Sequence, residues 1–161
     1  MNKLLTTAVL LAVACSLVHA QDKKQSEGAY LDAYIEMARS DLKTQKTALI
    51  AQAVPLTDSE SAVFWPLYRK YDLDFNRLSD ERVAIIKDYA ANYTGMSEAK
   101  AKELADRTLA WEQKRVELKK KYFAEFNKVL PAVKAARIMQ VETRINILID
   151  LQIASGVPLM E

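Results

Sequence analysis

The side chains that usually perform covalent or metal chemistry are almost missing from this sequence. It holds one cysteine and one histidine, Cys15 and His19, and both stand among the first twenty residues. After residue 20 there is no thiol nucleophile, no imidazole base and no soft metal ligand except scattered methionine. Three widely separated glycines cannot form a phosphate-binding loop. We therefore expect a protein that is not an enzyme and that uses no cofactor or metal.

Carboxylates are plentiful, but they alternate with lysine and arginine, as on solvated helix faces. A pair of carboxylates in a cleft could perform acid–base catalysis, yet no pattern singles out one pair. The run Asp72-Leu73-Asp74 lacks the glycine-bearing loop and the terminal glutamate of an EF-hand. With 23 basic and 21 acidic side chains, the sequence does not indicate a nucleic-acid partner.

Two stretches are candidates for binding another protein. The first, the aromatic stretch, is Phe64-Trp65-Pro66-Leu67-Tyr68; its alternative is a core anchor, since aromatic residues at helical spacing usually pack inward. The second, the basic run, comprises Lys114, Arg115, Lys119, Lys120 and Lys121. Glutamates interrupt it, so its alternative is a solvated helix face. The candidate binding residues are Phe64, Trp65, Pro66, Tyr68, Trp111, Arg115, Leu118, Lys119 and Tyr122.

Long amphipathic helices must position these residues. The segments between the rare glycines and prolines are rich in Ala, Leu, Lys, Glu and Arg, which favour helix. Apolar spacing predicts four helices, over residues 29–53, 58–92, 97–129 and 131–154. We expect an all-α fold of antiparallel helices joined by short turns, in an elongated or cradle-like arrangement.

The second predicted helix begins with a clear signal and then meets a proline. Thr57 is a good N-cap, and Glu60, three residues later, completes a capping box. Pro66 removes the backbone hydrogen bond to the Ala62 carbonyl, and its ring crowds that carbonyl. Either the helix bends there, or a short turn ends at Trp65 and a new helix starts with Pro66 in its first turn.

The third predicted helix carries two apolar series in which the spacing is seven residues. They are Leu104-Trp111-Leu118 and Leu109-Val116-Phe123-Leu130. Such a repeat suits long helices packed at a shallow angle. Its charged residues predict three pairs four residues apart, which are Glu98–Lys102, Glu103–Arg107 and Glu117–Lys121. Because an elongated monomer covers wide apolar faces poorly, we expect a homodimer.

The first twenty residues have the layout of a secretory signal peptide: Lys3, an uncharged run from Leu4 to Val18, and a small residue at Ala20. The apolar run is shorter than the roughly 20 residues that span a bilayer, so we expect no membrane span after cleavage. The expected location is the periplasm. A lipoprotein anchor at Cys15 is a weaker alternative.

Cleavage after Ala20 would leave 141 of the 161 residues, enough for one ordinary domain. We divide the chain into a signal peptide at 1–20, a disordered segment at 21–28, a single all-helical domain at 29–156 and a tail at 157–161.

Residues 50–60, Ile-Ala-Gln-Ala-Val-Pro-Leu-Thr-Asp-Ser-Glu, resemble the helix, turn and LTxxQ signature of the periplasmic Spy/CpxP-like proteins, with Glu60 in place of the Gln. A weaker similarity occurs over residues 129–137. The resemblance implies an exported, all-α, cradle-shaped antiparallel dimer. It also implies ATP-independent binding of unfolded or partly folded proteins on a concave surface of apolar and basic residues, and in some members a response to envelope or metal stress.

The leading hypothesis is an exported, non-enzymatic helical protein that binds unfolded or envelope proteins, as a holdase-type chaperone or a stress-response protein. Wide apolar faces beside long basic side chains are its physical basis. The alternative is a structural or assembly subunit of the bacterial envelope, which would use the same faces for one dedicated partner.

Overall fold

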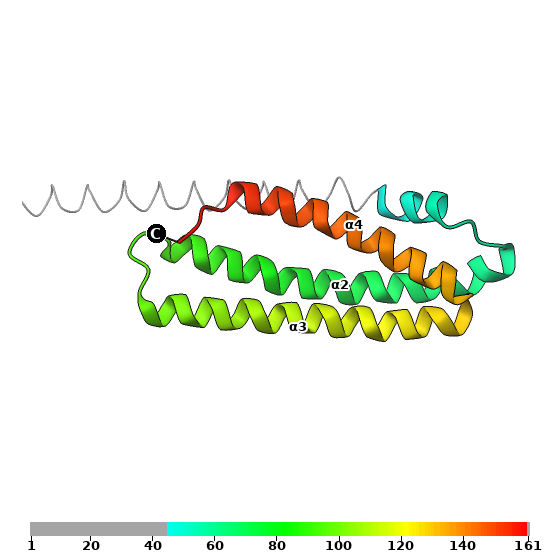
Figure 1. Cartoon of the computed structure of the whole chain (residues 1–161), viewed down its shortest axis with the longest axis horizontal. Coiled ribbons are helices and arrows are strands. Elements are labelled where there is room, and N and C mark those ends of the chain that lie inside the picture. The colour runs from blue at the N-terminus through cyan, green and yellow to red at the C-terminus, as the bar shows by residue number, and fades with distance from the viewer. Residues whose placement is uncertain (1–44, 161) are drawn as a thin grey trace, which may run out of the picture. The chain divides into compact units, whose positions relative to one another are not determined.

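The computed structural model describes residues 45–160, all of which belong to one compact unit, Ile35–Glu161. Three helices follow one another along the chain (Figure 1): α2 (Asp58–Asn92), α3 (Glu98–Val129) and α4 (Ala132–Gly156). Residues 45–53 form a further helical segment, and no strand occurs between residues 45 and 160. The predicted all-α fold of about four helices is confirmed, and the predicted ends of α2, α3 and α4 are right to within two residues.

Several predictions from the sequence concern residues 1–44, which lie outside the described part of the chain. They are the signal peptide at 1–20, the anchor at Cys15, the disordered segment at 21–28 and the beginning of the first helix at residue 29.

The three helices alternate in direction, as their contacts show. Tyr71 packs on Tyr122, whereas Trp111 Nε1 donates to the Leu78 carbonyl at 2.7 Å, so α2 and α3 are antiparallel. Glu60 of α2 pairs with Lys134 of α4 at 2.6 Å, and near the other end Tyr89 Oη donates to the Pro158 carbonyl at 2.8 Å. The helix α4 therefore runs parallel to α2 and antiparallel to α3.

Local signals explain where α2 and α3 begin. The predicted capping box is confirmed: Glu60 N donates to Thr57 Oγ1 at 3.2 Å, and Thr57 N donates to Glu60 Oε2 at 2.8 Å. Ser97 caps α3 by accepting from Lys100 N at 3.2 Å. Between them Gly95 has a φ of 83°, a left-handed conformation that favours glycine.

Pro66 lies inside α2, which runs without a break from Asp58 to Asn92. The alternative in which a first helix ends at Trp65 is therefore wrong. Because Pro66 has no N–H, the Ala62 carbonyl lacks its helical hydrogen bond. Both residues are exposed, so water can hydrate that carbonyl. Phe64 and Tyr68, on either side of the proline, are buried, and their burial offsets the cost of the missing bond.

The main core is aromatic. Phe64, Tyr68, Tyr71 and Phe75 project from α2 at helical spacing and meet Tyr122 and Phe126 of α3. Their ring centroids lie between 5.2 and 6.5 Å apart across the two helices, a spacing typical of stabilising aromatic pairs. The helical segment at 45–53 adds Ile50, and α4 adds Ala135 and Ile138.

A carboxylate is fully buried beside these rings. Glu142 of α4 accepts hydrogen bonds from Tyr68 Oη at 2.6 Å and from Tyr71 Oη at 3.1 Å. The ammonium of Lys46, also buried, lies 3.1 Å from Glu142 Oε2 and 3.0 Å from Asp72 Oδ1. Burial, with the nearby charge of Glu142, raises the pKa of the Tyr68 and Tyr71 phenols, so both remain protonated donors.

Replacing Pro66 by alanine should stabilise the protein. Pro66→Ala restores the hydrogen bond to the Ala62 carbonyl, so we expect the free energy of unfolding in urea to rise by about 1 to 3 kcal/mol at unchanged helix content. The control is Pro131→Ala, because Pro131 precedes α4 and lacks no helical hydrogen bond. A loss of stability in Pro66→Ala, or a changed scattering profile, would instead show that Pro66 sets a bend on which the packing depends.

Removing the charge of Glu142 should be far more damaging than removing an exposed one. Glu142→Gln leaves Lys46 with Asp72 alone, and we expect a loss of about 3 kcal/mol in the free energy of unfolding. The matched control is Glu81→Gln, because Glu81 pairs with Lys114 on the surface at 2.6 Å and should lose less than about 1 kcal/mol. Equal losses in the two variants would contradict the structural role given to Glu142.

Candidate functional site: a cationic groove between α3 and α4

A groove of about 580 Å³ lies between α3 and α4. Its lining residues are Lys119, Lys120 and Phe123 from α3 and Ala136, Met139, Gln140, Thr143 and Arg144 from α4. The α4 members recur every three or four residues and so share one helix face. The groove thus combines apolar side chains with three cations, and no carboxylate is among its described lining residues.

Lys119 is the most constrained of the three cations. It is half-buried, and its Nζ donates to Thr143 Oγ1 at 3.4 Å. Desolvation, together with repulsion from the Arg115 charge, lowers the pKa of the Lys119 ammonium. An anion that entered the groove would relieve this repulsion, because Lys119 has no carboxylate within ion-pair distance among the described residues.

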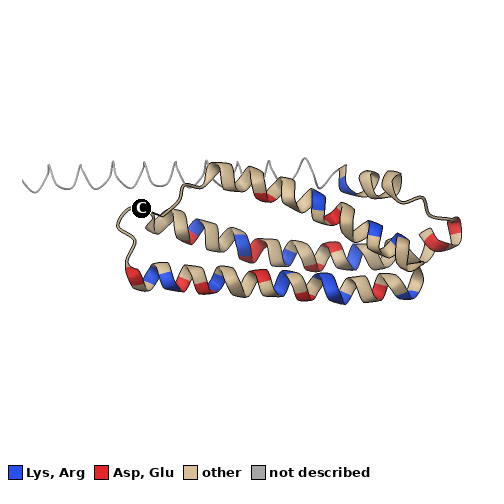
Figure 2. Ribbon diagram, viewed as in Figure 1, with Lys and Arg blue, Asp and Glu red and all other residues tan. Residues whose placement is uncertain are grey.

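The other two cations are more accessible. Lys120 is exposed and shares its charge with Glu117, at 2.9 Å on the same helix. Arg144 is exposed on α4. Figure 2 shows lysine and arginine interleaved with acidic residues along α3, so the basic run is a mixed helix face except where Lys119 and Lys120 meet α4.

Apolar side chains extend from the groove along the outer side of α3. Leu109, Val116 and Phe123, which we call the apolar row, are 69%, 48% and 39% exposed. The other series has the opposite environment, since Leu104 and Trp111 are buried and Leu118 packs against the core. Five residues separate Leu104 from Leu109, which is about 140° around a helix of 3.6 residues per turn. The first series therefore faces α2, whereas Leu109, Val116 and Phe123 of the second are left uncovered and only its last member, Leu130, is buried.

Four of the nine candidate binding residues from the sequence are buried in the interior. They are Phe64, Tyr68, Trp111 and Tyr122, so the structure places Phe64 and Tyr68 of the aromatic stretch in the core. Trp65 is half-buried and packs against the core, as Leu118 does, and Pro66 is exposed.

The remaining two candidates belong to the basic run. Arg115 pairs with Glu112 at 2.6 Å and with Asp150 at 2.8 Å, and does not line the groove. Of the nine candidate binding residues, only Lys119 lines the groove. Sequence reasoning missed Met139 and Arg144, which no motif marks, and it placed Phe123 in a packing series. The two apolar series lie about 140° apart around α3, so one neighbouring helix cannot cover both. This angle was the signal that could have identified Phe123 as a surface residue.

The described residues offer no obvious metal site and no membrane span. No group of three or more His, Cys, Asp or Glu side chains among them is placed to hold a metal ion. None of the described helices combines the length and the apolar character that crossing a membrane requires.

Comparison with models of protein families, with curated proteins and with solved structures finds no match to this chain.

The groove should bind a dye that joins an aromatic body to an anion. We expect anilinonaphthalene sulfonate to bind the folded protein, and Lys119→Glu combined with Arg144→Glu to weaken binding at least fivefold in a fluorescence titration. The matched control is Lys102→Glu combined with Lys114→Glu, which makes the same charge change at exposed positions of α3 outside the groove. Equal weakening by both pairs would mean that only net charge matters.

Proposed function

We propose that this chain is an exported, non-enzymatic helical protein that binds unfolded or partly folded envelope proteins without ATP, as Spy/CpxP-like chaperones do. The observation that carries the proposal is the apolar row on α3, exposed over two helical heptads and ending in the cationic groove at Phe123. The resemblance of residues 50–60 to the LTxxQ signature supports the same reading.

The chemistry of this surface suits clients without a fixed shape. Unfolded chains expose apolar side chains, which gain free energy when the apolar row removes them from water. Lysine and arginine add flexible stems and charged ends that reach different acidic groups on different clients. Neither contact demands shape complementarity, so one surface serves many sequences.

The expected homodimer belongs to the same proposal. On α4, Ile147, Leu148 and Leu151 are between 55% and 66% exposed and lie within four residues of one another. A second copy that packed on this surface would remove these side chains from water while leaving the apolar row of α3 to clients.

The proposal is tested by suppression of aggregation. At a stoichiometric ratio the purified protein should keep reduced insulin and chemically denatured malate dehydrogenase from scattering light. Val116→Ser combined with Phe123→Ser should lose most of this activity, because it makes the apolar row polar. The matched control is Val63→Ser combined with Leu73→Ser, which changes two exposed apolar side chains of α2.

Failure of the wild-type protein with every client would remove the proposal. Crosslinking in cells would then decide the alternative role as a subunit of the envelope. A broad set of crosslinked proteins agrees with a chaperone, whereas one dominant partner agrees with a dedicated assembly.

A further inference from the structure

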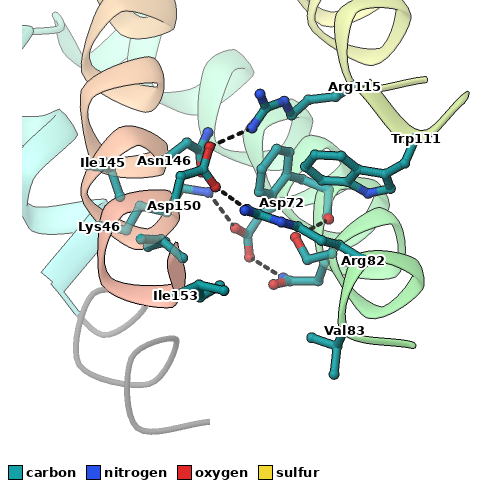
Figure 3. Close-up of a pocket in the computed structure, with 14 residues that line it drawn as sticks. Lys46, Asp72, Arg82, Val83, Trp111, Arg115, Ile145, Asn146, Asp150 and Ile153 are labelled. Carbon is teal, nitrogen blue, oxygen red and sulfur yellow. Dashed lines mark hydrogen bonds and ion pairs between the residues drawn. The ribbon is translucent and has the colours of Figure 1, made fainter. Parts of the chain in front are cut away.

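A separate cavity of about 60 Å³ lies deeper in the protein, where α2, α3 and α4 meet beside Lys46 (Figure 3). Its apolar wall includes Val83, Ile145, Ile149 and Ile153. A water molecule needs roughly 10 to 15 Å³ of such space, so the cavity has room for about four water-sized groups. It shares no lining residue with the groove between α3 and α4.

Two arginines are held in fixed positions at this cavity. The Cζ atoms of Arg82 and Arg115 lie 5.0 and 4.7 Å from the centre of the Trp111 ring. Both guanidinium groups also donate to Asp150, Arg82 to Oδ1 and Arg115 to Oδ2 (Figure 3). Each arginine comes from a different helix, so the cavity's cationic side is preorganised by packing and by ion pairs.

The carboxylates at the cavity are already engaged. Asp150 accepts from the two arginines, and Asp72 accepts from Lys46 at 3.0 Å and from Asn76 at 3.1 Å. Three cations and two carboxylates line the cavity, although Lys46 and Arg115 also pair with Glu142 and Glu112 outside it. Among the described residues Arg82 donates to one carboxylate, Asp150, and it has five N–H groups, so it retains donor capacity.

One polar atom at the cavity has no partner. Asn146 is 4% exposed and lines the cavity, and its Nδ2 is the single buried side-chain nitrogen or oxygen without a hydrogen bond among the described residues. Its side chain does lie close enough to the Tyr71 phenol to oppose the rise in the pKa of that group. Buried polar groups are nearly always hydrogen-bonded, because an unpaired one has lost its water without compensation. Nδ2 is a donor, so what it requires is an acceptor.

We propose that this cavity binds a small aliphatic carboxylate. The carboxylate accepts hydrogen bonds from Asn146 Nδ2 and from the Arg82 guanidinium, and the short alkyl chain lies against the isoleucines of α4. A carboxylate supplies the acceptors that these donors require, and a charged acceptor binds a guanidinium group more strongly than a neutral one does. The size of the cavity limits the ligand to about the length of acetate or propionate.

The test follows sodium propionate in two ways on the full-length protein, with sodium chloride at equal ionic strength as the reference. In a Trp65→Phe background Trp111 is the sole tryptophan, since the sequence has two, and its fluorescence should change saturably. In the wild-type protein the side-chain amide protons of Asn146 should shift in nuclear magnetic resonance spectra with the same midpoint. Propylamine, a cation of similar size, should produce neither change.

Asn146→Leu should raise the midpoint at least tenfold, and Asn127→Leu, the same change at an exposed position of α3, should leave it unaltered. If Asn146→Leu does not fold, the wild-type amide shift still decides the matter. A change that does not saturate, an equal response to propylamine, or an unchanged midpoint in folded Asn146→Leu would overturn the proposal and leave a hydrated cavity.

Discussion

The packing of α4 depends on one buried charge. A carboxylate as fully enclosed as Glu142 must be satisfied by hydrogen bonds or by a cation, because removing it from water is costly. Tyr68 and Tyr71 of α2 supply the donors, and Lys46 supplies the cation. Sliding α4 by one residue would turn Glu142 away from all three. The network therefore fixes the register of α4 on α2 and also holds the helical segment at 45–53 in place.

Further consequences of this register appear along α4. Glu142, Asn146 and Asp150 are four residues apart, so the helix face that carries the buried carboxylate also carries Asn146 and brings Asp150 to the two arginines. Ile147, Leu148 and Leu151 are correspondingly turned outward and exposed. In this part of α4 the inner face combines Glu142 and Asn146 with Ile145 and Ile153, while the outer face carries exposed apolar side chains that an ordinary surface helix would not leave uncovered. The same contact thus forms the inner cavity and leaves an apolar outer surface.

What the sequence could predict was local. The helix boundaries follow from Thr57, Ser97 and Gly95, whose effects reach only a few residues, and the capping box needs no knowledge of the fold. The buried role of Glu142 could not be read, since its partners lie more than 70 residues away. The ion pairs of α3 show the same limit, because only a pair within the helix could be predicted from the spacing of its residues. Glu103–Arg107 forms at 3.0 Å as predicted, whereas Lys102 pairs with Asp106 and Lys121 reaches Asp74 of α2.

The candidate site also depends on contacts between helices, which the sequence pattern does not reveal. Two series with identical spacing have opposite environments along α3, although Leu130 at the end of the second is buried. Periodicity reveals an apolar stripe but not which helix will cover it. The packing of α2 covers the stripe that contains Trp111, while α4 approaches the second stripe only near Phe123. Exposure along that row accordingly falls from 69% at Leu109 to 39% at Phe123. A helix with two apolar stripes needs two neighbours, and the described part of this chain covers only one stripe well. The surface left over is apolar and lies beside cations, and the proposed binding of other proteins rests on this surface.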